Sequence, residues 1–212
     1  MSARSVETSH ERGLSIALPP PETYHAGIDL CAQGKPAKSV CYVVEGVVKL
    51  THVRADGRQI ILDLTFPGEL IGADAALLGE ECLETATTVT DCGIARWGLP
   101  EFRARFEREP GFLMEAMRVL CRQMGRHRCR ITELGFETGR ERLEALLRRW
   151  PGAAVGFDLP LNREEIGQVL LISSYHVSRL LGELEQDRVI RREMRRIRVQ
   201  PVALWRAAAQ RA

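Results

Sequence analysis

The stretch LNREEIGQVLLISSYHVSRLLGEL, residues 161–184, carries the most specific pattern in this 212-residue chain. Asn162 precedes Glu165 by three positions, the spacing of a helix-capping residue and its acidic partner, and Ser173 is a good cap for a second helix. The second helix has an apolar stripe at spacings of i, i+3, i+4 and i+7, formed by Val177, Leu180, Leu181 and Leu184. Since the LLI run between the helices leaves room for only a short turn, the stretch predicts a helix-turn-helix.

An arginine-rich hairpin is predicted directly after these helices. Residues 188–199, RVIRREMRRIRV, form two strand-like runs around a tip that contains Glu193 and Met194. Together with the helices, this hairpin makes a winged helix-turn-helix, in which a helix enters the DNA major groove and cationic hairpin side chains meet phosphates. The predicted DNA-binding residues are Asn162, Arg163, Ser173, Ser174, Tyr175, His176, Ser178, Arg179, Arg191, Arg192, Arg195 and Arg196.

Charge is divided unevenly between the halves of the chain. Residues 1–117 carry 11 Lys and Arg against 17 acidic residues, whereas residues 118–212 carry 19 Arg against 11 acidic residues. A basic half suits an anionic partner, and nucleic acid is the usual one. The alternative is a solvent-exposed, arginine-rich surface that binds no partner.

The composition, 45% hydrophobic and 27% charged, is typical of a soluble globular protein. No apolar run approaches the ~20 residues of a membrane-spanning helix, and the N-terminus lacks the apolar segment of a secretory signal, so a cytoplasmic location is expected. We find no catalytic triad, paired carboxylates, phosphate-binding loop or metal-ligand spacing, so an enzyme is not expected. The six cysteines form no CxxC pair, and most are expected to be small buried side chains.

The first half of the chain has the pattern of short β-strands, from Tyr24 to Trp97. The runs VCYVVEG and VVKLTHV flank Glu45-Gly46, which predicts a hairpin, and Asp56-Gly57 predicts a second tight turn. Many short strands with glycine-containing turns and no long helix predict an antiparallel roll or barrel. Residues 1–18 are expected to form a loose arm.

Residues 111–138 predict one long helix with a narrow apolar seam. The seam recurs in steps of four and three residues, the heptad spacing of a coiled coil, and consists of Leu113, Met117, Leu120, Met124, His127, Ile131 and Leu134. Arginines crowd the faces beside it, which favours a two-chain coiled coil over a helix packed on its own domain. A shorter helix, RERLEALLRRW, follows and is expected to end at Pro151-Gly152.

The whole pattern resembles the CRP/FNR superfamily of bacterial transcription regulators. The resemblance rests on the GELIG element at residues 68–72, the long central helix, REEIGQVL, and the S-x-x-x-V-S-R-L-L-x-x-L run after it, and it covers nearly the whole chain. It implies an α+β fold with three parts. These are a cyclic-nucleotide-binding-like antiparallel β-roll sensor domain over residues 1–110, a dimerisation helix over 111–138, and a winged helix-turn-helix over 139–212. It also implies a homodimer that reads a two-fold-related DNA site.

The resemblance points to an effector other than cyclic AMP. In cyclic-AMP-binding members an Arg-Ser pair meets the cyclic phosphate, but Glu84-Thr85 stands at that position here, and a carboxylate would repel the phosphate. In those members a glutamate also follows the Ile-Gly pair of this element, and Ala73 replaces it here. An iron–sulfur cluster of the FNR type is not expected, because Cys92 matches one of its four cysteines and the first 30 residues contain none.

The region around GELIG is nonetheless closer to the FNR-like branch, so a redox, gas, haem or small-molecule signal stays open. Histidine could ligate haem, and the histidines in or near the roll are His10, His25 and His52. A thiol switch would use Cys31, Cys41, Cys82 or Cys92. The candidate residues of the effector pocket are Gly68, Glu69, Ile71, Gly72, Glu84, Thr85, Cys92 and Cys121.

His127 is unusual for the predicted seam, where it would face its copy in the second chain. Because like charges repel in a partly dry seam, we hypothesise that His127 makes dimer stability depend on pH or on a bound metal. The alternative is a neutral histidine that sets the register of the coiled coil.

Two substitutions distinguish the predicted recognition helix and its turn from the family that they resemble. Arg179 keeps the arginine that donates two hydrogen bonds to guanine, but Tyr175 stands where a base-reading glutamate is common. Leu171 replaces the glycine of the turn, so this residue must accept a strained backbone or a modified turn.

The sequence therefore predicts a homodimeric, sequence-specific DNA-binding transcription regulator. Its partners would be double-stranded DNA, a second copy of the chain and, if it is an activator, RNA polymerase; no membrane partner is expected. The alternative is a sensor or adaptor whose helix-turn-helix mediates protein contacts. The arginine-rich hairpin favours DNA.

Overall fold

The computed structural model describes residues 18–193 and 196–209, so nearly all of the predicted N-terminal arm lies outside the described residues. The chain forms two compact units. The first contains the described residues up to Leu50 together with Thr65–Arg126, and the second contains Thr51–Leu64 and the described residues from His127 onward. The domain boundaries at residues 110 and 138 stay a prediction. Within the described ranges, no helix is both long and apolar enough to span a membrane.

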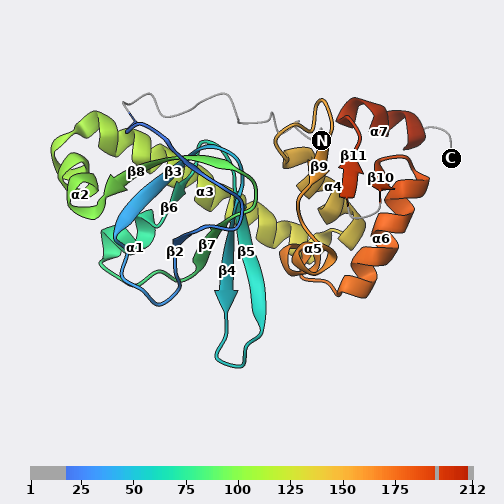
Figure 1. Cartoon of the computed structure of the whole chain (residues 1–212), viewed down its shortest axis with the longest axis horizontal. Coiled ribbons are helices and arrows are strands. Elements are labelled where there is room, and N and C mark those ends of the chain that lie inside the picture. The colour runs from blue at the N-terminus through green and yellow to red at the C-terminus, as the bar shows by residue number, and fades with distance from the viewer. Residues whose placement is uncertain (1–17, 194–195, 210–212) are drawn as a thin grey trace. The chain divides into compact units, whose positions relative to one another are not determined.

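Two four-stranded sheets form the antiparallel roll that the sequence predicts (Figure 1). One sheet has the order β1-β8-β3-β6, with β1 Glu22–Tyr24, β8 Cys92–Gly98, β3 Ser39–Glu45 and β6 Leu70–Ile71. The other has the order β2-β7-β4-β5, with β2 Asp29–Cys31, β7 Thr85–Thr88, β4 Val48–Val53 and β5 Gln59–Thr65. Four consecutive residues of β3, 40–43, are buried, which accounts for the continuous apolar run in the sequence, whereas β7 alternates between half-buried and buried residues.

The turn at Glu45-Gly46 connects the two sheets, so the hairpin predicted there is wrong. β3 pairs with β8 and β6, whereas β4 neighbours β7 and β5. Gly46 has a φ of 89°, and a methyl group in its place would lie 2.5 Å from the carbonyl oxygen of Asp91, so this close approach requires glycine. The second predicted turn is confirmed: the chain reverses at Asp56-Gly57 between β4 and β5, where the Gly57 amide donates to Arg54 O at 2.9 Å.

An aromatic cluster anchors the first helices on the roll. The ring of Trp97 lies 6.1 Å from that of Phe102 and 5.5 Å from that of Phe112, between centroids. Ala116 and Val119 belong to the same buried cluster. α1 (Ala73–Leu78) lies between β6 and β7, whereas α2 (Leu99–Arg108) and the beginning of α3 (Pro110–Phe136) follow the last strand of the roll.

The second unit contains a winged helix-turn-helix, as the sequence predicts (Figure 1). Its elements are α4 (Gly139–Arg149), β9 (Phe157–Leu159), α5 (Arg163–Leu170), α6 (Ser174–Gln186), β10 (Ile190–Glu193), β11 (Arg196–Val199) and α7 (Val202–Ala209). Thr138 begins α4 through a capping box with Glu141. The wing is a sheet of order β10-β11-β9, and its third strand is absent from the sequence prediction because three residues are too few to show a period.

Candidate DNA-binding site

Asn162 positions the first helix of the motif. Its side-chain oxygen accepts hydrogen bonds from the amides of Glu164 and Glu165, both at 2.9 Å, and the Asn162 amide donates one to the Glu165 carboxylate. This capping box satisfies the first amides of α5 in the way that the sequence spacing predicts. The Asn162 oxygen is therefore engaged within the protein, although the residue remains exposed.

The turn between α5 and α6 depends on one glycine and one strained leucine. A methyl group on Gly167 would lie 2.7 Å from the carbonyl oxygen of Ile172, so only glycine allows this close crossing. Leu171 has φ 53° and ψ 45°, a left-handed conformation that β-carbon crowding disfavours. The structure thus selects the strained backbone for Leu171 from the two alternatives that the sequence leaves open.

The two faces of α6 differ sharply in exposure. Val177, Leu180, Leu181 and Leu184 are all buried, as their spacing predicts. Ser173 caps the helix by accepting a bond from the His176 amide at 3.2 Å. Tyr175, in contrast, is 83% exposed and Ser174 is exposed beside it. This face has the polar, solvent-facing character that contact with base edges requires.

Arg179 is held by its neighbours on the exposed side of α6. Its guanidinium lies 3.2 Å from His176 Nε2 and 3.8 Å from Glu183, while its side chain stays 65% exposed. Arg163 lies beside this face, since its guanidinium reaches the Ser178 hydroxyl at 3.4 Å. Arg163 with Ser178, and Arg179 with His176, therefore form two pairs of side-chain contacts on the exposed side of α6.

The wing arginines fall into two environments. Arg191 and Arg196 have 74% and 77% of their side chains exposed, although each lies within 4 Å of a carboxylate. Arg192 donates its amide and its Nε to Glu185 at 2.9 and 2.7 Å, and this hydrogen bonding lowers the pKa of Glu185. Arg192 is thus tied to α6. Arg195 lies outside the described residues.

The candidate effector-pocket residues do not form one cluster. Ile71 and Cys92 lie in a buried hydrophobic cluster, Glu84 and Thr85 are half-buried, and Cys121 is exposed on α3. Gly68 and Gly72 have φ of 96° and 73° and shape the ends of β6, next to the buried Glu69. The sequence reasoning missed two side chains of α3 that contact the GELIG element.

Gln123 and Arg126 of α3 bind the GELIG element directly. Gln123 accepts a bond from the Leu70 amide at 3.1 Å and donates one to the Leu70 carbonyl at 2.9 Å. Arg126 forms an ion pair with Glu69, which also accepts a bond from the Phe66 amide. This element is therefore contacted by side chains of the same chain.

These two residues belong to a second stripe on α3, one position before the predicted seam. Its members are Phe112, Ala116, Val119, Gln123, Arg126 and Arg130, at steps of four and three. Half of these residues are polar, so a search for apolar residues alone does not reveal the stripe. Their heptad spacing, however, is a signal from which the stripe could have been predicted. The neighbouring seam is more exposed: Met117, Met124 and Ile131 are 43%, 58% and 69% exposed.

Four of the six cysteines are buried or half-buried, as expected for most of them. Burial raises the pKa of the Cys31, Cys41, Cys82 and Cys92 thiols, that of Cys31 to about 12, which makes them poor nucleophiles. Cys121 and Cys129 are exposed. Of the candidate haem ligands, His25 is exposed and lies 3.4 Å from Asp91, and His10 lies outside the described residues. Among the residues described, no group of three or more His, Cys, Asp or Glu could hold a metal ion.

His127 has a carboxylate neighbour in its own chain. Its Nε2 lies 3.0 Å from Asp63 Oδ2, and Asp63 is only 5% exposed. The His127 side chain is 52% exposed, so it contacts Asp63 while part of it stays open to solvent. Any effect of His127 protonation on the dimer must therefore take account of the neighbouring Asp63 carboxylate.

Two short helices across a tight turn, a three-stranded wing and an exposed polar helix face define a winged helix-turn-helix DNA-binding domain. Family models support this class: the Crp-like helix-turn-helix domain matches residues 141–204, and the cyclic nucleotide-binding domain matches residues 21–109. The chain belongs to the CRP/FNR superfamily of transcription regulators.

Relatives from both branches of the superfamily resemble the chain. The transcriptional activator protein FnrL of Cereibacter sphaeroides is 26% identical over 185 residues, covering 82% of this chain and 73% of FnrL. The cAMP-activated global transcriptional regulator CRP of Pasteurella multocida is 29% identical over 175 residues, covering 79% of this chain and 83% of CRP. The structure of FixK2 from Bradyrhizobium japonicum matches with a TM-score of 0.73 at 20% identity, over 91% of this chain and 98% of FixK2, which supports the fold.

Proposed function

We propose that the protein is a homodimeric regulator whose α6 helices enter successive major grooves of DNA. The observation that carries the proposal is the exposed row of Ser174, Tyr175 and Arg179 on a helix whose opposite face is fully buried. The N-terminal residues of such a helix reach base edges, while Arg163 and the exposed wing arginines meet phosphates. Its site of action would be the cytoplasm, where bacterial DNA lies.

Tyr175 should change the DNA sequence that the protein prefers. Arg179 can donate two bonds to guanine, but a tyrosine cannot offer cytosine the carboxylate acceptor that a glutamate would. We therefore expect a half-site that departs from the family's usual one at the base pair facing Tyr175. Selection of bound sites from random duplexes tests this. Recovery of the usual half-site would show that the Tyr175 argument is wrong, and no enrichment of any sequence would favour the adaptor function instead.

The second copy is proposed to pack along the predicted seam of α3. Met117, Met124 and Ile131 are spaced seven residues apart and expose apolar surface along one line of the helix, as a coiled-coil partner requires. Sedimentation measures the dimer constant. We expect Met124→Glu to shift the protein towards monomer, whereas Arg122→Glu, a change of charge outside the seam, should leave the dimer in place.

His127 provides a sharper test of the seam. If its protonation controls association, the dimer constant should differ between about pH 5.5 and about pH 8, and the difference should vanish in His127→Leu. A difference that persists in His127→Leu would assign the pH dependence to other groups. No difference in the unaltered protein would leave His127 with the role of setting register.

The effector is proposed to differ from cyclic AMP. Glu84 brings a negative charge to the place where the resemblance calls for an arginine, and Gln123 and Arg126 already contact the GELIG element. Calorimetry with cyclic AMP should therefore show no binding, and binding at micromolar concentration would overturn the proposal. Absorption spectra of protein purified with and without oxygen would reveal haem or an iron–sulfur centre. If the protein is an activator, RNA polymerase is its further partner.

A further inference from the structure

His176 is one of the residues predicted to contact DNA, but its ring lies against another residue of the same helix. His176 is half-buried, whereas its neighbour Tyr175 is 83% exposed. The Nε2 atom of His176 lies 3.2 Å from Nη2 of Arg179, which follows three positions later on α6. The imidazole is therefore in direct contact with the arginine that is proposed to read guanine.

The partner of His176 determines which ring nitrogen carries the hydrogen. Every N–H group of an arginine is a donor and none of its atoms accepts a hydrogen bond, so Nε2 of His176 must be the acceptor. A neutral imidazole that accepts at Nε2 carries its hydrogen on Nδ1. Arg179 therefore donates one hydrogen of Nη2 to a neutral His176.

Two other contacts restrict the His176 ring. The His176 amide donates to the Ser173 hydroxyl at 3.2 Å, which fixes the backbone in the first turn of α6. The first residue of α4, Gly139, is close to the ring: a methyl group there would lie 3.6 Å from both Cε1 and Nε2 of His176. Because α4 leaves little room beside the imidazole, His176 offers Arg179 an acceptor in a fixed position.

Glu183 adds a weaker restraint on the same guanidinium. Its carboxylate lies 3.8 Å from Arg179 Nε and 3.9 Å from Nη1 of Arg140, which also pairs with Asp187. An exposed ion pair at such a distance contributes little. The hydrogen bond to His176 is therefore the main restraint on Arg179.

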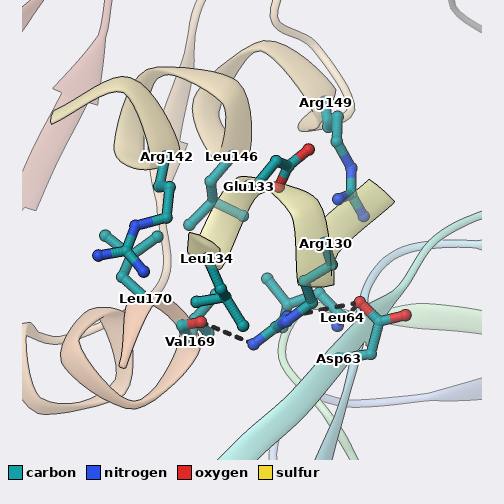
Figure 2. A pocket seen from close by; sticks show the side chains of 10 residues that line it. All are labelled: Asp63, Leu64, Arg130, Glu133, Leu134, Arg142, Leu146, Arg149, Val169 and Leu170. Atoms are coloured by element: carbon teal, nitrogen blue, oxygen red, sulfur yellow. Dashed lines mark hydrogen bonds and ion pairs between the residues drawn. The ribbon is translucent and has the colours of Figure 1, made fainter. Parts of the chain in front are cut away.

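Arg179 keeps donors for DNA in spite of these contacts. Arg130, in contrast, uses its guanidinium within the protein, where it donates to the Val169 carbonyl at 2.7 Å and lies 3.8 Å from Asp63 (Figure 2). In the described part of the chain, Nη1 of Arg179 has no partner, and Nη2 uses one of its two hydrogens on His176. Two parallel donors therefore remain at the end of the guanidinium, as a bidentate contact with guanine requires.

We propose that His176 is a positioning residue that holds the Arg179 guanidinium in the orientation that reads guanine and does not itself contact DNA. This inference rests on the proposed function. An arginine side chain loses conformational freedom when it binds, and a contact that restrains it beforehand lowers this cost. Since base contacts specify sequence, the restraint should raise the preference for guanine more than the affinity for DNA in general.

Competition binding tests the proposal with duplexes that differ only at the base pair that Arg179 reads. His176→Leu removes the acceptor and should lower the preference for guanine over the other bases by about fivefold. His176→Gln should retain most of the preference, because its side-chain carbonyl can accept the same bond. Gln186→Leu is the control, because it replaces a polar, exposed side chain about two turns further along α6, and it should leave the preference unchanged.

A double variant separates positioning from direct contact with DNA. If His176 acts through Arg179, His176→Leu should cause no further loss of affinity in a protein that already carries Arg179→Ala. A histidine that contacts DNA itself would lower the affinity by the same factor with and without Arg179.

A measurement without DNA detects the contact itself. Nitrogen NMR spectra should show the hydrogen of neutral His176 on Nδ1 in the unaltered protein and mainly on Nε2, the form that a free imidazole favours, in Arg179→Ala. Circular dichroism verifies that each variant is folded, and the NMR result decides the case if His176→Leu does not fold.

Three results would overturn the proposal while leaving the proposed function in place. These are an unchanged guanine preference in folded His176→Leu, an additive loss in the double variant, and a hydrogen on Nε2 of His176 in the unaltered protein. If the unaltered protein shows no preference among the duplexes, the proposed function is wrong, and this inference is wrong with it.

Discussion

Two groups of arginines in the basic half of the chain have opposite surroundings. Arg179, Arg191 and Arg196 expose 65%, 74% and 77% of their side chains on α6 and the wing. Arg130 exposes only 17% and bonds to two backbone carbonyls, and Arg142 has its Nε buried. The excess of arginine in this half is therefore not a sign of DNA binding alone, because some of these arginines are enclosed by the protein.

The difference follows from where each arginine lies on its helix. Arg179 is on the polar side of α6, opposite its buried leucines. Arg130 continues the stripe of α3 that begins with Phe112, Ala116 and Val119, so it turns inwards. If this interpretation is right, substitutions in one group should change folding stability and those in the other should change DNA affinity, with little overlap.

The largest effect should come from Arg130→Met. This change leaves the carbonyls of Ile61 and Val169 without their donor and removes a positive charge near the buried Asp63, so it should lower the free energy of unfolding by about 3 kcal/mol. Urea unfolding at fixed protein concentration measures it. Arg128→Met, exposed on the same helix, should change stability by less than about 0.5 kcal/mol. Similar losses in both variants would contradict the comparison.

Arg179→Ala should show the reverse behaviour. We expect a loss of about 1–3 kcal/mol in binding free energy that is confined to one base pair of the half-site, with stability almost unchanged. Competition among duplexes substituted at each position measures the effect. An equal loss on every duplex would make Arg179 a contact to the DNA backbone.

Two arginines of the wing, Arg191 and Arg192, should differ in their contribution to DNA affinity. Arg191→Ala should weaken binding by about 1 kcal/mol on all sequences and reduce the slope of log affinity against log salt by about one, as loss of a phosphate contact does. Arg192→Ala should change the salt slope less, because Arg192 already bonds Glu185. Titrations at several salt concentrations compare the two variants, and a steeper loss for Arg192 would reverse their assigned roles.

Leu171→Gly should have the smallest effect on stability and should not alter the contacts of either group of arginines. Glycine relieves the strain of the left-handed backbone but gains freedom in the unfolded chain, so we expect a net stabilisation of about 0.5 kcal/mol. DNA affinity should stay the same. Thermal unfolding detects the change, and a destabilised variant would mean that the half-exposed Leu171 side chain makes contacts worth more than the strain.

Sequence reasoning predicted the elements near the DNA-binding face better than those that form contacts across the chain. The caps at Asn162 and Ser173 and the buried stripe of α6 are confirmed. The hairpin predicted at Glu45-Gly46 is wrong, because the same turn residues connect strands of two different sheets. The α3 stripe that includes Gln123 was missed, because its polar members bond polar groups of segments far away in the sequence and so interrupt the apolar pattern.

The sequence by itself determined the family, the two helices of the motif and which face of α6 is exposed. These features depend on residues three or four positions apart, whose relative directions the helix period sets. Only the tertiary structure decided that His127 meets Asp63, 64 positions away, and that Arg130 meets Ile61, 69 positions away. Residues so far apart in the chain follow no local period. The sequence therefore does not distinguish an arginine that is enclosed in the folded protein from one that is exposed.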